Sequence, residues 1–228
     1  MDRRIDLRAE LSVGRHALDT ARVVEVAAWI RNHPRQAGRV IELLWDDDAG
    51  VASRAADVLE RVSVDPSHSL HRVLADHKEA LLGLLSDAPF IKLRWNLAFV
   101  IPRLPLTLAE ARRAASVLQT FLDDRSSIVK TAALQALADL TRHDPASLPE
   151  VLDLLRIQGR SGTPAMRARS RHLLQRLDPS ASSTSRWRLA PSQDRETATI
   201  ETRMRSMEPF KPALTDAGSR ARAGRKRR

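Results

Sequence analysis

His68, His71 and His77 lie close together in the sequence, and histidine ring nitrogens are common metal ligands. Three ligands at the start of one helix need a geometry that spacing alone does not provide, and no His-Glu-x-x-His pattern occurs. The chain has no cysteine, which excludes thiolate nucleophiles, disulfides and cysteine-ligated metals. Its eight glycines are scattered and form no phosphate-binding loop. We therefore predict no catalytic residue, no metal and no cofactor, which favours a protein that is not an enzyme.

The elements that would position any binding residues follow a repeated apolar pattern. Four segments, starting at Val51, Leu93, Val129 and Met166, place apolar residues at the spacing of one helix face. The starts are separated by 42, 36 and 37 residues, a period typical of stacked helical pairs. The pattern predicts four units, each with a first helix, a short turn and a second helix, over residues 34–177.

The helix boundaries follow from local signals. Pro34 suits the first turn of a helix, and the aspartates at 46–48 suit the turn and cap before the second helix. Thr107 and Glu110 have the spacing of a capping box. The first helix of the second unit is expected from about residue 70 to 85. A further helix over 21–31 precedes the units, and we expect it to cap the open apolar end of the stack.

Two stretches, LLWDDDAGVASRAADVL and FLDDRSSIVKTAALQAL, resemble HEAT repeats. In that family the second helix follows an Asp-containing turn and carries a Val-Arg or Val-Lys step and then an Ala-Ala pair. The resemblance covers residues 34–177; the second unit departs from it at Leu97 and Pro102, and the fourth at Ser170 and Arg171. It implies an all-α fold, a right-handed α-α superhelix of about four helical pairs, with second helices lining the concave side.

The concave face of such a solenoid is its usual interaction surface, and the second helices present mostly basic residues away from the core. One set of residues comes directly after the first apolar residue of each unit's second helix. The other set lies near the C-terminal end of that helix. The candidates are Arg54, Arg61, Arg94, Asn96, Phe99, Arg103, Lys130, Arg169 and Arg176. They would suit an acidic protein surface or the phosphates of nucleic acid.

Structural pairing is the competing interpretation, and for Arg94 and Lys130 it carries the greater weight. The turns of the units supply carboxylates that these residues are expected to meet, Asp124 among them. The helix-end arginines Arg61 and Arg103, like Arg176, have fewer obvious partners, and ordinary surface solubility is their alternative role.

The tryptophans divide into two groups. Trp29, Trp45 and Trp95 sit beside apolar neighbours at helical positions, which favours packing in or at the edge of the core over base stacking. Trp187 instead lies between two arginines outside the repeats, where it is suited to a partner, a nucleic acid or the chain's own helical domain.

The formal net charge of +10 is concentrated towards the C-terminus. Residues 178–228 carry 12 lysines and arginines against 6 acidic residues, compared with 26 against 22 in residues 1–177. The C-terminal segment is rich in Ser, Pro and Arg and has no helix-period apolar stripe, which predicts a disordered basic tail. Its binding candidates are Arg186, Trp187, Arg188, Arg225, Lys226, Arg227 and Arg228.

The predicted organisation is an N-terminal arm (1–20), a HEAT-like repeat domain (21–177) and the tail (178–228). Every apolar run is too short for a signal peptide or a membrane helix, so we expect a cytoplasmic protein without a membrane partner. The predicted function is a non-catalytic scaffold that binds a protein partner, for which an acidic surface is one candidate, through the concave face.

Nucleic-acid binding is the alternative function. A second alternative is an enzyme like the HEAT-like DNA glycosylases that excise alkylated bases, which the basic face and aromatic residues allow. That family places an Asp one turn after a Trp, and this chain does not: His33, Ala49, Phe99 and Pro191 occupy those positions. Excision of a base needs a placed carboxylate as well as affinity for phosphate.

Overall fold

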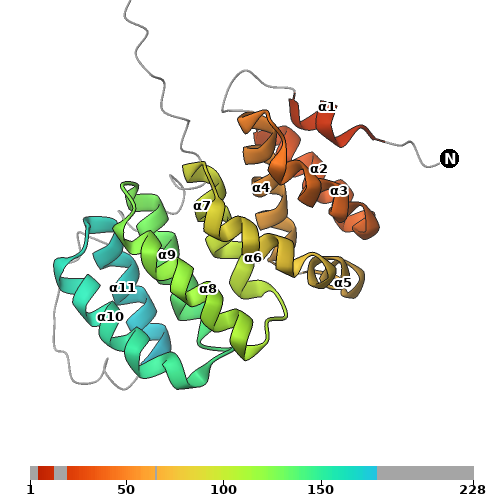
Figure 1. Ribbon diagram of the computed structural model, residues 1–228. Helices are drawn as coiled ribbons and strands as arrows, with labels where there is room; N and C mark the ends of the chain where they lie inside the picture. The colour runs from red at the N-terminus through yellow and green to blue at the C-terminus, as the bar shows by residue number, and fades with distance from the viewer. Residues whose placement is uncertain (1–4, 13–19, 65, 179–228) are drawn as a thin grey trace, which may run out of the picture.

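The computed structural model describes residues 5–12, 20–64 and 66–178, and all regular elements in these ranges are helices (Figure 1). The predicted all-α class is therefore confirmed for this part of the chain. The tail residues from 179 onwards, including all the binding candidates placed there, lie outside the described residues. No helix in the described ranges is both long enough and apolar enough to span a membrane.

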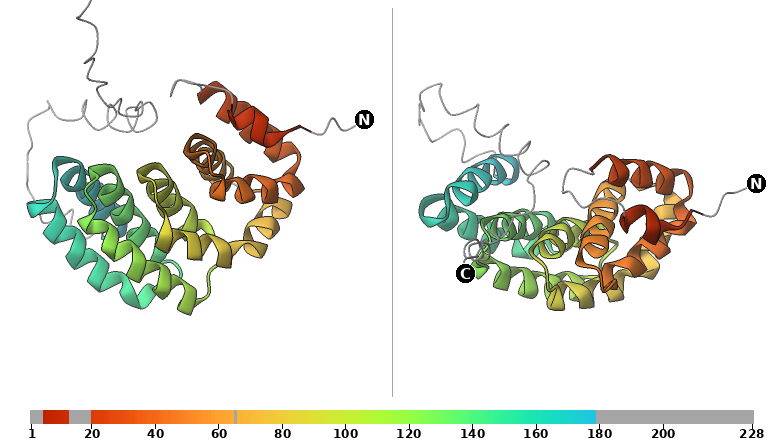
Figure 2. Two further views of the ribbon diagram at one scale, coloured as in Figure 1. Left: turned by 45° about the horizontal axis from the view of Figure 1, so that its top comes forward. Right: turned by 90° about the horizontal axis from the view of Figure 1, so that it is seen from above.

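Five helices lie side by side in chain order and form one layer (Figures 1 and 2). They are α2 (Thr20–Asn32), α4 (Ala49–Ser63), α7 (Ile91–Val100), α9 (Ser127–Leu140) and α11 (Pro164–Leu177). We call this the inner layer, because α4, α7, α9 and α11 follow the inner side of the arc in the left view of Figure 2. Apart from α2, these are the predicted second helices of the four units.

The first helices form an outer layer along the other side of the arc (Figure 2). They are α3 (Ala37–Glu42), α5 (His68–Asp76), α6 (Lys78–Asp87), α8 (Leu108–Thr120) and α10 (Leu148–Ser161). Short 3₁₀ turns extend or precede helices of both layers: η1 (Pro34–Gln36), η2 (Leu43–Trp45), η3 (Ile101–Arg103), η4 (Phe121–Asp123) and η5 (Pro145–Ser147). Three of these turns carry a proline in their first positions. In η1 and η5, which begin helical segments, the missing N–H costs no hydrogen bond.

Caps and apolar stripes explain why these segments are helical. The Asp48 carboxylate accepts hydrogen bonds from the backbone N–H groups of Gly50 (2.7 Å) and Val51 (3.3 Å) at the start of α4. The apolar starts of the repeated pattern, such as Val51 and Leu93, are fully buried between the layers. The central helix α9 is buried at every position from Thr131 to Ala138, because helices of both layers surround it.

The first helix of the second unit is broken, contrary to the single helix expected over 70–85. The break is at His77, with φ −103° and ψ 4°, and its ring Nδ1 lies 2.8 Å from the carbonyl oxygen of Val73. A Cβ atom on Gly38 would lie 3.3 Å from the His77 ring, so α3 and this corner fit closely. The break lets α5 pack on α3 while α6 packs on α8.

A short helix, α1 (Leu7–Ser12), lies within the segment expected to be an N-terminal arm. Its two leucines, Leu7 and Leu11, are buried against the body of the protein, and Arg8 Nε lies 2.7 Å from Asp46 Oδ2. Six residues are too few to form a stable helix alone, so this helix depends on its tertiary contacts. The predicted additional helix over 21–31 is present as α2, which packs on α4.

The predicted capping box at the start of α8 is confirmed and is joined by an ion pair. Glu110 accepts from the Thr107 backbone N–H at 2.7 Å, and Lys78 Nζ lies 2.8 Å from the other Glu110 oxygen. The hydrogen bond from Lys78 and then that from Thr107 lower the pKa of Glu110 to about 2. This carboxylate thus links α8 to the start of α6.

We expect Glu110→Gln to lower the free energy of unfolding at pH 7 by roughly 1–2 kcal/mol, because glutamine keeps the cap but loses the ion pair. The pKa of Glu110 is lowered by folding, so its contribution is full above its unfolded value of 4.5 and is lost as the pH falls towards about 2. Urea unfolding at pH 7, 4 and 3 should show the difference from wild type shrinking below pH 4.5. The exposed Glu42→Gln is the control, and a difference independent of pH would contradict this account.

Candidate binding surface

Arginines near the C-terminal ends of the inner helices bind the neighbouring inner helix. Between α2 and α4, Arg31 donates to the Arg61 carbonyl oxygen at 2.7 Å. Between α9 and α11, Arg176 Nη2 lies 2.7 Å from Asp139 Oδ1. Between α7 and α9, the segment after α9 supplies the donor, and Arg142 binds the Pro102 carbonyl oxygen at 2.6 Å.

The link between α4 and α7 has the most hydrogen bonds of this series. Arg103 Nη1 donates to the Glu60 carbonyl oxygen and to Ser63 Oγ, each at 2.9 Å, and Nη2 donates to Glu60 Oε1 at 3.0 Å. The expectation that helix-end arginines have few partners is therefore wrong for Arg103 and Arg176. Arg61 differs, since its guanidinium has no hydrogen bond or ion pair within the described ranges.

Arg94 and Lys130 each follow the first residue of a unit's apolar pattern. They differ in whether the turn of the next unit offers a carboxylate. Arg94 Nε lies 2.9 Å from Asp124 Oδ2 in the turn of the next unit, and its Nη1 donates to the Ala88 carbonyl oxygen at 3.1 Å. This is the pairing that we expected for Arg94. Lys130 has no such partner among the residues described here, because the turn of the following unit, 159–164, contains no carboxylate.

Polar residues midway along the inner helices also join neighbours. Asn96, expected on the exposed side, is instead buried between α4 and α7, and its Nδ2 donates to Asp57 Oδ1 at 2.9 Å. Lys92 Nζ lies 2.6 Å from the other oxygen of Asp57. Further along the layer, Arg169 donates to Gln135 Oε1 at 3.0 Å.

At the N-terminal end of the inner layer, Arg54 also binds a neighbouring helix. Its Nε donates to the carbonyl oxygen of Leu11, which ties α4 to α1. Most of the predicted cations of this face therefore bind other parts of the protein rather than extending freely into the solvent.

An aromatic pair occupies the middle of the inner face, on α7. Trp95 and Phe99 follow the buried Leu93 and Leu97 by two residues, which places them on the side of the helix opposite those leucines. Their rings meet edge to face, with centroids 6.0 Å apart and planes at 83°. Both are partly exposed and pack against the core at their bases. The sequence selected Phe99 as a binding candidate and favoured packing for Trp95, which does pack against the core.

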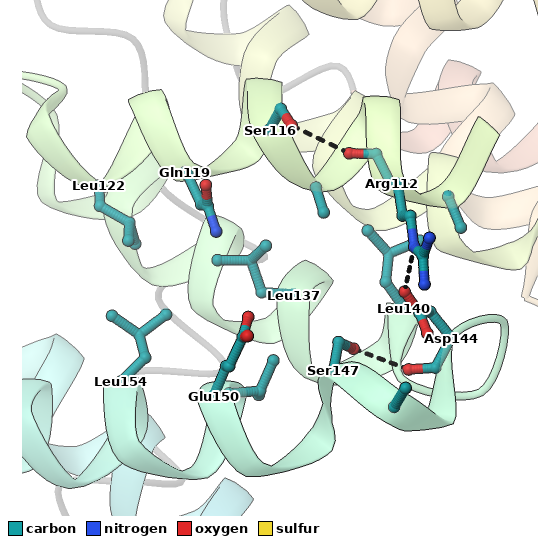
Figure 3. A pocket seen from close by; sticks show the side chains of 14 residues that line it. Arg112, Ser116, Gln119, Leu122, Leu137, Leu140, Asp144, Ser147, Glu150 and Leu154 are labelled. Atoms are coloured by element: carbon teal, nitrogen blue, oxygen red, sulfur yellow. Dashed lines mark hydrogen bonds and ion pairs between the residues drawn. The ribbon is translucent and has the colours of Figure 1, made fainter. Parts of the chain in front are cut away.

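The outer layer contains a groove that the sequence did not predict, between α8 and α10 (Figure 3). It encloses about 560 Å³, with Leu137 and Leu140 of α9 among the residues that line it. An ion pair between Arg112 Nε and Asp144 Oδ2, 2.8 Å apart, closes one end. The hydrogen bond to Asp144 raises the pKa of Arg112.

Among the described residues, no three His, Asp or Glu side chains are grouped so that they could hold a metal ion, and this includes His68, His71 and His77. Trp45 is half exposed at the end of η2, whereas Trp29 packs against the core and stacks on His33 with ring centroids 4.4 Å apart.

No model of a known protein family matches this chain, and no curated protein matches it either. Two surfaces of the described residues are therefore the candidates for binding: the aromatic inner face and the outer groove.

We expect Arg103→Ala to lower the free energy of unfolding by about 1.5–3 kcal/mol, because it leaves Glu60 and Ser63 without their shared donor. Arg103→Lys should recover less than half of the loss, since a single ammonium cannot reproduce the planar fork. Chemical denaturation followed by circular dichroism measures both effects.

Arg72→Ala is the matched control for Arg103→Ala, because Arg72 is exposed on α5 and pairs with nothing in the described ranges. It should change stability by less than about 0.5 kcal/mol. Equal effects of the two alanine substitutions would show that the links between inner helices do not stabilise the layer.

Proposed function

We propose that this protein is a non-catalytic scaffold of the HEAT-like type, a right-handed α-α superhelix that binds a protein partner through its inner face. In this proposal the inner face is the concave side, the basic tail adds electrostatic contacts, and the protein works in the cytoplasm. The single observation that carries the proposal is the partly exposed Trp95–Phe99 pair at the middle of the inner layer, surrounded by charges that are already paired.

The order of the helices supports the HEAT-like part of the proposal. Successive inner helices pack side by side in chain order, and α4, α7, α9 and α11 each lie beside an outer helix of the same unit. The caps also agree, since Asp48 caps α4 and Asp124 accepts a hydrogen bond from the Ser126 backbone N–H, 2.7 Å away, before α9. Units that contact mainly their neighbours along the chain are the defining property of solenoids.

The aromatic pair supports a protein partner. Protein interfaces combine an apolar centre with a polar rim, and Trp is among the residues that contribute most to binding. Trp95 and Phe99 provide such a centre. The ion pairs Lys92–Asp57 and Arg103–Glu60, which flank them, provide a rim whose charges are balanced.

The same pairing weighs against nucleic acid as the main ligand of this face. Affinity for a phosphate backbone comes from cations that are free to replace counterions. Arg94, Arg103 and Arg176 are each within 3.0 Å of a carboxylate oxygen, which already neutralises them. A glycosylase-like enzyme would need a free carboxylate beside the aromatic residues, but Asp57 is bound by Lys92 and Asn96.

Capture of a partner with variants of the inner face tests the proposal. Immobilised full-length protein is exposed to extract of the source cell at about 0.5 M salt, where exposed charges are strongly screened. We expect Trp95→Ala to reduce recovery of the partner about tenfold or more, since truncating a central aromatic residue removes its buried contact area. Recovery is quantified by mass spectrometry after circular dichroism has shown that the variant is folded.

Arg72→Glu, on the outer layer, is the matched control and should recover as much partner as wild type. Labelled DNA and RNA are titrated in parallel with wild type and with an Arg61→Glu/Lys130→Glu variant. The proposal fails if Trp95→Ala recovers the same partner equally well. It also fails if wild type binds nucleic acid with a steep salt dependence that the double variant abolishes.

A further inference from the structure

The groove between α8 and α10 has an apolar floor and a polar rim, in which the acidic residues Asp144 and Glu150 outnumber the single basic residue Arg112. Figure 3 shows Leu137 between the two helices, with Leu122 and Leu154 at one end. Glu150 of α10 also lines the groove, is exposed, and pairs with no cation among the residues that the structure describes. Arg112, the one basic residue among those that line the groove, is already bound to Asp144. The groove therefore suits a segment that offers a large apolar side chain together with positive charge.

We propose that residues 186–189 of the tail, Arg-Trp-Arg-Leu, occupy this groove in the same molecule. Trp187 would cover the leucine floor, and an adjacent arginine would pair with Glu150. A tryptophan side chain buries about 150–250 Å² of surface. The volume of the groove, about 560 Å³, lies within the range of pockets that hold ligands. The inference concerns the outer layer and does not depend on the function proposed for the inner face.

The place where the described chain ends makes this contact reachable. Asp178, the last described residue, has Oδ2 3.1 Å from Arg156 Nη2, and Arg156 belongs to α10, one wall of the groove. Trp187 lies nine positions after Asp178 in the sequence, and an extended chain of that length spans at most roughly 30 Å. A helix with its side chains is only about 10–12 Å across, so the segment can pass round α10 to the groove.

Charge favours this segment over the rest of the tail. Arg186 and Arg188 flank the tryptophan directly and match the unpaired Glu150. Phe210, the other aromatic residue of the tail, has a single basic neighbour, Lys211, and an acidic residue, Glu208, two positions before it. It therefore serves as the internal control.

Distance measurement between two spin labels tests the proposal in the full-length chain. Because the protein has no cysteine, Thr120→Cys beside the groove and Ser185→Cys in the tail create the only two thiols. We expect one narrow, short distance distribution by electron–electron double resonance. Trp187→Ala and Glu150→Arg should each broaden it, while Phe210→Ala and Glu42→Arg, on the exposed side of α3, should leave it unchanged.

Three results would overturn the proposal. A broad distribution in the otherwise unaltered chain would show that the tail does not dock. A narrow distribution insensitive to Glu150→Arg would place the segment elsewhere. Loss of the narrow component when labelled protein is diluted into unlabelled protein would show that the occupant is the tail of a second copy.

Discussion

The structure depends on hydrogen bonds that arginines make between successive inner helices. Packing of apolar side chains restricts the angle between neighbouring helices, but the hydrophobic effect itself has no direction and fixes their register less sharply than a hydrogen bond does. An arginine that donates to a carbonyl oxygen or a carboxylate at one point of the next helix fixes the position of that helix relative to its own. Arg103, with three hydrogen bonds to Glu60 and Ser63, is the fullest example, and Arg31 and Arg142 bind carbonyl oxygens in the same manner.

Because these arginines are bound within the fold, the high net charge of the protein is weaker evidence for binding to a polyanion. A chain with a formal charge of +10 suggests affinity for polyanions, yet much of the positive charge of the inner layer is used within the fold. The exposed surface at the centre of this layer is instead the edge-to-face pair of Trp95 and Phe99. Paired charges cost less to desolvate than isolated ones, which supports our proposal of a protein partner over a phosphate backbone.

Four of the inner helices could be predicted from the sequence because their apolar stripes are long and recur every 36 to 42 residues. The capping box of Thr107 and Glu110 could be predicted because its geometry is local. The break at His77 and the helix α1 could not, since both depend on contacts with distant parts of the chain, Gly38 in one case and α2 and α4 in the other.

The candidate site was predicted less well than the fold. A helical wheel shows which side of a helix a residue occupies, but it does not show which residue of the next unit lies opposite. The packing of one unit on the next determines the partners of Asn96, Arg103 and Arg176. Each of these partners lies about 40 positions earlier in the chain. The outer groove was missed for the same reason, because α8 and α10 belong to different units.

Hydrogen exchange of the wild-type backbone, followed by mass spectrometry, tests most directly whether the inner layer is a stack held together by neighbouring contacts. Helices flanked on both sides should open least often, so we expect the slowest exchange in α7 and α9 and faster exchange towards α1, α2 and the end of α11. Uniform exchange across all helices would indicate a single cooperative unit. That result, or fast exchange in α9, would contradict this account of the fold.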